Sequence, residues 1–172
     1  RETGMDAVRL VQGTVGQCEG IYDLIMFHHS FEHMENPREV IQDVCRKLRV
    51  GGILILSLPL AGSHAFQEYG RYWVQLDAPR HIFLHSKRSL TILAGEAGLV
   101  EERIIYDSSA FQYVGSIQYK KGMDGDARRS LLGMLEYVFL AMLKYSQRAK
   151  EDNHNQEGDQ ATFVFKKYEG NH

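Results

Sequence analysis

A histidine-rich segment follows one of the most apolar runs of the chain. His28, His29, Glu32 and His33 stand in close succession, and a further candidate, His81, comes later in the sequence. Imidazole titrates near neutral pH, so His33 and His81 are predicted to act as general bases. Glu32 can orient one of these histidines or support the start of the following helix. His28 and His29 also allow the plainer interpretation that they only end a strand.

Residues 60–79 form a second segment whose side chains could take part in binding or catalysis. This segment has no hydrophobic periodicity and is rich in aromatic side chains. Long irregular segments inside a compact domain are usually functional or disordered. Tyr69 and Trp73 can form the walls of a substrate pocket, and Arg80, just beyond the segment, can bind an anionic group. The alternative is a loop that packs against the domain and binds nothing.

Two strands are predicted to position the histidines. Tyr22–His28 is almost entirely apolar, and residues 53–58 form a second apolar run that ends at Pro59. Continuous apolar runs of this length are typical of parallel strands that are buried on both faces.

A helix is predicted between these strands. Asn36 stands at the capping position and Pro37 at the first helical position, and Gly51-Gly52 is expected to end the helix. The apolar positions that repeat at helical spacing are Val40, Ile41, Val44 and Leu48. Strand, helix and strand in this order form a βαβ unit, which predicts a parallel sheet.

The C-terminal half continues the α/β pattern. Ser86 is expected to cap a helix that ends at Gly98, and strands are predicted at 100–106 and 161–167. Between these strands, residues 124–148 predict a helix with a wide apolar face. It is expected to cover the sheet, although a dimer interface or a substrate lid would use the same face. Residues 150–158 are polar and predict a mobile loop.

Composition excludes several classes of protein. The chain has 172 residues, a net charge of −2 and scattered basic residues, so no nucleic-acid partner is expected. No apolar run is long enough to span a membrane. Cys18 and Cys45 show no metal or disulfide pattern, which favours reduced thiols and a cytoplasmic location.

Several motifs together resemble class I S-adenosylmethionine-dependent methyltransferases of the small-molecule, ubiquinone-biosynthesis-like type. The resemblance is most specific at Asp23-Leu24-Ile25, Glu32-His33 and Asn36-Pro37, and it continues at 76–81 and at 158–166. It implies an α/β, Rossmann-like fold in which a mostly parallel sheet ends with an antiparallel last strand. The family's strand order is 3-2-1-4-5-7-6.

The chain departs from the family at its N-terminal end. The family binds its cofactor with a glycine-rich loop after the first strand, and no GxGxG sequence occurs here. Residues 1–14 align with the end of the second helix and the third strand, which is expected at 8–11. Residues 1–172 are therefore expected to be a partial methyltransferase domain without its N-terminal βα units. In this partial domain, 124–158 is a helical insertion and polar loop before the last strand.

The resemblance also implies positions for the cofactor. Residues after the family's third and fourth strands lie near S-adenosylmethionine, and the matching positions here are Gly13, Thr14, Phe27, His28 and His29. No metal is expected. The alternative is a site formed by His29, Glu32 and His33, which resembles the Glu-x-x-Glu-His pattern of magnesium-dependent relatives. The exchange of the first Glu for His would suit Zn²⁺ or Fe²⁺ better than Mg²⁺.

The expected function is methyl transfer from S-adenosylmethionine to a small-molecule, sugar or lipid-linked acceptor, with oxygen as the accepting atom. The chain by itself is expected to be poorly active, because the glycine-rich loop is absent from it. The alternative function is a non-catalytic remnant that serves as a binding or dimerisation module. In either case, the sheet edge at Tyr22–His28 lacks its neighbours, so self-association is expected there.

Overall fold

The computed structural model describes residues 10–122 and 131–170. A four-stranded mixed sheet forms its centre, with strand order β1-β2-β4-β3. The strands are β1 (Tyr22–His28), β2 (Leu48–Pro59), β3 (Leu99–Tyr106) and β4 (Gln160–Lys167). β1 and β2 are parallel, and β4 lies antiparallel to both β2 and β3. Three strands therefore share one direction, and only the last runs the other way.

This topology confirms the predicted fold class. The expected order 3-2-1-4-5-7-6 ends with 4-5-7-6, and the observed order β1-β2-β4-β3 reproduces that half strand for strand. Within the described residues, β1 pairs only with β2, so its other edge has no strand beside it. This is the edge where strands 1 to 3 of the family would lie.

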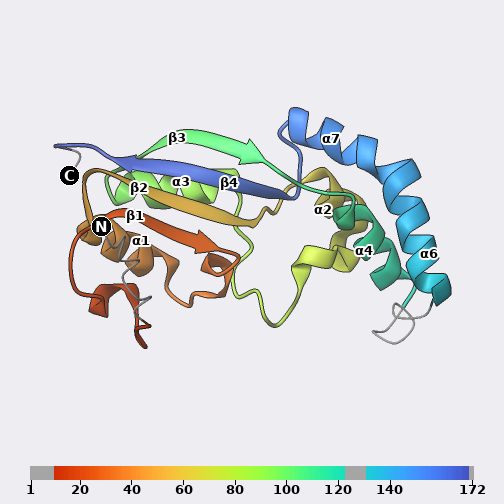
Figure 1. Ribbon diagram of the computed structural model, residues 1–172, viewed down its shortest axis with the longest axis horizontal. Helices are drawn as coiled ribbons and strands as arrows, with labels where there is room; N and C mark the ends of the chain where they lie inside the picture. The colour runs from red at the N-terminus through yellow and green to blue at the C-terminus, as the bar shows by residue number, and fades with distance from the viewer. Residues whose placement is uncertain (1–9, 123–130, 171–172) are drawn as a thin grey trace, which may run out of the picture.

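Two helices cover one face of the sheet. Helices α1 (Pro37–Lys47) and α3 (Lys87–Glu96) contact each other and lie on the same side of the strands (Figure 1). The core between these helices and the sheet is formed mainly by alternate strand residues, including Phe27, Leu54, Leu56, Leu58, Phe163 and Phe165. The opposite face is largely uncovered in the described structure, and there Leu24 and Met26 are 52% and 59% exposed.

The remaining helices gather beyond the carboxyl ends of β1, β2 and β3 (Figure 1). They are α2 (His64–Tyr69), α4 (Phe111–Lys120), α6 (Leu131–Leu140), a π-helical turn (Ala141–Tyr145) and α7 (Ser146–His154). Short 3-10 turns lie at Val15–Gln17, Phe31–His33, Gly70–Tyr72 and Val74–Leu76. A second apolar cluster around Trp73 and Tyr113 holds this region together.

Two predicted boundaries in the N-terminal part were wrong. Leu48, expected on the helix, is the first residue of β2, and Gly51-Gly52 lies inside that strand, opposite a register shift in β1. A side chain at Gly52 would meet the Arg49 carbonyl oxygen at 2.8 Å, so the glycine allows a close backbone approach rather than a helix end. Asn36 is at the N-cap, but its side chain accepts no capping hydrogen bond.

The strand predicted at 8–11 lies partly outside the described residues. Of this range, residues 8 and 9 are not described, and Leu10 and Val11 are exposed and belong to no strand. The cap expected from Ser86 is confirmed, because its side chain accepts a hydrogen bond from the Ser89 amide.

Segments predicted to be irregular contain helices. Residues 60–79 hold α2 and two 3-10 turns, and α4 was not predicted at all. The helix expected at 124–148 begins in residues that are not described, and α7 extends it to His154, into the segment 150–158 expected to be a mobile loop. Asp152 in that segment is buried and accepts hydrogen bonds from Gln112 and Tyr113. In the described parts of the chain, no helix has the length and apolar character needed to cross a membrane.

Candidate functional site

The histidine-rich segment lies at the carboxyl end of β1, where open parallel sheets place their ligands. The chain leaves β1 through His29, whose amide donates to the Ser57 carbonyl of β2 at 2.9 Å, and then forms the turn Phe31–His33. The Glu32 carbonyl accepts hydrogen bonds from the amides of Ile82 and Phe83, at 3.0 and 3.2 Å. The turn after β1 and the segment before α3 are thus fixed to each other through their main chains.

This main-chain connection brings His33 and His81 together. Their ring centroids are 5.0 Å apart, and each ring is anchored by a backbone carbonyl. His33 Nδ1 lies 2.7 Å from the Arg80 oxygen, and His81 Nδ1 lies 2.8 Å from the Gln75 oxygen. A carbonyl can only accept, so each Nδ1 carries a proton and donates it. In the neutral ring Nε2 is then unprotonated, as a general base or a metal ligand requires.

Glu32 faces the same two rings from the protein interior. The residue is 1% exposed, and neither carboxylate oxygen has a hydrogen-bond partner. Its Oε1 lies 4.0 Å from His81 Nε2 and 3.6 Å from His29 Nδ1. Burial of a carboxylate that accepts no hydrogen bond is costly, so this group marks the place where a proton, a cation or a ligand donor would be favourable.

The residues predicted to contact the cofactor lie in three different surroundings. His28 is exposed and packs edge-on against His29, with ring centroids 4.7 Å apart. Phe27 points into the core, where its ring packs against Phe31, so its side chain does not reach a ligand site. Thr14 caps the turn Val15–Gln17.

Thr14 and His33 line a common groove. The groove has a volume of about 320 Å³, and its walls also include Met34, Asn36 and Val40. Gly13 precedes Thr14 on the same exposed segment and does not line this groove. The structure therefore brings one predicted cofactor residue, Thr14, beside one predicted catalytic residue, His33.

The three predicted substrate residues are not together. Arg80 is exposed and forms an ion pair with Asp77 at 2.6 Å, and its carbonyl holds His33. Trp73 is 2% exposed, and its Nε1 donates to Asp159 at 3.0 Å. Burial raises the pKa of Asp159 to about 6. Tyr69 packs against the cluster around Trp73, and burial raises its pKa. Only Arg80 is therefore placed beside the histidines.

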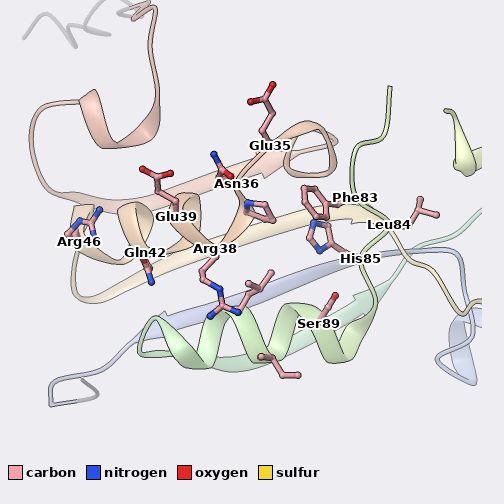
Figure 2. A pocket seen from close by; sticks show the side chains of 13 residues that line it. Glu35, Asn36, Arg38, Glu39, Gln42, Arg46, Phe83, Leu84, His85 and Ser89 are labelled. Atoms are coloured by element: carbon pink, nitrogen blue, oxygen red, sulfur yellow. The ribbon is translucent and has the colours of Figure 1, made fainter. Parts of the chain in front are cut away.

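A larger groove, of about 930 Å³, lies between α1 and α3 (Figure 2). Its walls combine charged residues of α1, such as Arg38 and Glu39, with Phe83 and His85 from the segment before α3. His85 is stacked between Phe31 and Phe83, and burial lowers its pKa to about 4. His85 is thus neutral at physiological pH. None of the sequence-predicted site residues lines this groove.

Comparison with known proteins identifies the family and the fold. Residues 4–102 match the family described as "Methyltransferase domain", and this range includes β1, β2 and the whole histidine cluster. The chain belongs to the class I S-adenosylmethionine-dependent methyltransferases.

Solved structures with the same fold are distant in sequence. A methyltransferase from Thermotoga maritima, described as a possible histamine N-methyltransferase, has a TM-score of 0.57 and 14% identity, covering 93% of this chain and 64% of its own. A putative sarcosine dimethylglycine methyltransferase from Galdieria sulphuraria has a TM-score of 0.51 and 18% identity, covering 91% and 57%. An O-methyltransferase of a Brevibacillus brevis polyketide synthase, solved with S-adenosylhomocysteine, has a TM-score of 0.50 and 15% identity, covering 92% and 48%.

The chain therefore spans only about half to two thirds of the length of these structures. At such low identities the likeness concerns the fold alone. A search of curated proteins gave no significant match.

Proposed function

We propose that the protein containing this chain transfers a methyl group from S-adenosylmethionine to a small-molecule, sugar or lipid-linked acceptor, at oxygen. The observation that carries this proposal is the histidine and glutamate cluster at the carboxyl end of β1, in a chain of the methyltransferase family. No nucleic acid is expected as a partner. The free thiols Cys18 and Cys45 support a cytoplasmic location.

Methyl transfer needs mainly alignment, because the sulfonium of the cofactor is already a reactive methyl donor. A hydroxyl acceptor also has to lose its proton. His33 and His81 present unprotonated Nε2 atoms in their neutral form, so either ring can accept that proton. Thr14, His28 and His29 are the proposed cofactor contacts with accessible side chains, and Gly13 and Phe27 could contribute through their main chains. Arg80, exposed next to His81, is the residue best placed to attract an anionic acceptor.

The second candidate function is a methyltransferase-like module that binds a partner and does not catalyse. Its supporting observation is the open sheet face that carries Leu24 and Met26. The two functions differ in one property that can be measured directly, which is cofactor binding by the full-length protein.

Calorimetric titration with S-adenosylhomocysteine separates the two. The complete protein is expected to bind at micromolar concentration, and the 172-residue chain alone is expected to bind far more weakly, because it lacks a glycine-rich loop. Absence of saturable binding by the complete protein would favour the non-catalytic module. Micromolar binding by the short chain would show that the loop is not needed, against the idea of a partial cofactor site.

A further inference from the structure

The cluster at the end of β1 has the composition of a metal site. One ligand atom each from Glu32, His33 and His81 lie within 4.8 Å of one another. We propose that these three side chains bind one divalent transition-metal ion of the Zn²⁺ or Fe²⁺ class and leave a coordination position open. Metal binding at this site does not require that the protein transfers methyl groups.

Glu32 gives the first argument. Its carboxylate is 1% exposed and both oxygens lack a hydrogen-bond donor, although His29, His33 and His81 surround it. His29 Nδ1 and His81 Nε2 lie 3.6 and 4.0 Å from Glu32 Oε1, too far away for hydrogen bonds. Burying a carboxylate that accepts no hydrogen bond is costly, and a divalent cation at this place would satisfy it. His33 is exposed, so the cluster can be reached from solvent.

The two histidines give the second argument. Each donates Nδ1–H to a backbone carbonyl, His33 to Arg80 and His81 to Gln75. In proteins, metal-bound histidines almost always donate their second ring nitrogen to a carbonyl, a carboxylate or water, which fixes the tautomer and the orientation of the ring. His33 and His81 therefore already have the outer partners that a metal ligand needs.

The ligand set points to the class of metal. Two imidazoles and one carboxylate are the ligands of catalytic zinc sites and of non-haem iron sites, both of which keep open positions. Mg²⁺ prefers oxygen ligands and is disfavoured here. Ligands of a tetrahedral zinc ion lie about 3.4 Å apart, given bond lengths of about 2.0–2.2 Å. Here the three ligand atoms lie within 4.8 Å of one another, with Glu32 Oε1 and His81 Nε2 4.0 Å apart, so side-chain rotations have to bring them closer around an ion.

The site differs from the alternative suggested by the sequence. The pattern His29-x-x-Glu32-His33 predicts His29 as the third ligand. In the structure, the third residue close to Glu32 and His33 is instead His81, from the segment before α3. His29 lies beside Glu32, at 3.6 Å, but outside the set of mutually close ligand atoms. An ion held by Glu32, His33 and His81 would lower the pKa of a water or an acceptor hydroxyl at its open position. The effect on an acceptor hydroxyl rests on the proposed methyl transfer.

The test is metal binding by the untagged, chelator-treated 172-residue chain. Zn²⁺ is expected to bind with one ion per chain and to raise the melting temperature by about 5–10 °C at 100 times its dissociation constant. Co²⁺ is expected to produce visible absorption bands from a nitrogen and oxygen site. Glu32→Gln and His81→Asn should each weaken Zn²⁺ binding by more than the roughly 10–100-fold that is typical of outer-shell changes. The control His154→Asn, on the exposed end of α7, should bind like the wild type.

Glu32→Gln also distinguishes a loss of metal binding from a failure of the variant to fold. This variant removes a buried carboxylate that accepts no hydrogen bond, so without metal it should fold with a stability close to that of the wild type, and it should gain no stability from Zn²⁺. Failure of the wild-type chain to bind Zn²⁺ or Co²⁺ stoichiometrically would overturn the metal site and leave the proposed methyl transfer standing. Unchanged binding by both Glu32→Gln and His81→Asn would place any bound ion elsewhere and would also overturn it.

Discussion

Replacing His33 or His81 with alanine in the complete protein is expected to lower the turnover of methyl transfer by about 10²–10⁴-fold. The affinity for S-adenosylhomocysteine should change far less, because neither ring belongs to the proposed cofactor contacts. The reason is the position of the two rings beside Glu32, with each Nδ1 held by a backbone carbonyl and each Nε2 left to accept a proton. A proton acceptor and a metal ligand both act in the chemical step, so both roles predict a loss in kcat.

The matched control is His154→Ala, which removes an exposed histidine at the end of α7 and should leave turnover unchanged. Single-turnover measurements separate chemistry from product release, and calorimetry gives the cofactor affinity of each variant. If both His33→Ala and His81→Ala turned over within about twofold of the wild type, alignment of the substrates alone would account for catalysis. The roles proposed for the two histidines would then be wrong.

The 172-residue chain is expected to form a dimer or a larger assembly at micromolar concentration through the open edge and face of β1. In the described structure β1 pairs with a strand on one side only, and Leu24 and Met26 are more than half exposed. An unpaired apolar edge readily pairs with another chain. Burying the exposed part of each side chain would contribute about 1 kcal/mol. Two chains would bury four such side chains, equivalent to about a thousandfold in the dissociation constant.

The double variant Leu24→Lys, Met26→Lys tests this surface. It should shift the sedimentation profile to the monomer, because two charges on each edge strand oppose strand pairing. Leu132→Lys is the control, since Leu132 on α6 is 81% exposed and lies away from the sheet. A monomeric wild-type chain with fast amide exchange in Tyr22–His28 would show that solvent tolerates this edge. Loss of association in the Leu132 variant alone would assign the interface to the helical region.

The strands that form the sheet were predicted well because their residues carry strong local signals, whereas Leu10 and Val11 of the strand expected at 8–11 belong to no strand. β1 begins and ends where its apolar run does, and the order of the sheet follows from the family resemblance. The error at Gly51-Gly52 has a physical reason, because glycine can end a helix or permit a close backbone approach within a strand. Only the pairing of β1 with β2 distinguishes the two.

Helix α4 was not predicted, for a different reason. It is buried on several sides, and its buried positions include polar residues such as Gln112 and Ser116, so no apolar stripe appears at helical spacing. The side chain of Phe27 could have been assigned to the core from strand alternation, since Phe27 and Ile25 share the face covered by α1. The approach of His81 to Glu32 depends on long-range hydrogen bonds of the Glu32 carbonyl, which the sequence pattern does not reveal.

Hydrogen exchange of the complete protein with and without S-adenosylhomocysteine tests the central claim most directly. If the chain forms part of a cofactor site at the carboxyl end of β1, the ligand should slow amide exchange in residues 13–17 and 26–30, and leave α7 unchanged. These two segments contain all the proposed cofactor contacts, and they lie apart in the sequence. If the ligand slowed exchange in neither segment, or only in regions remote from β1, the assignment of this site to S-adenosylmethionine would be contradicted.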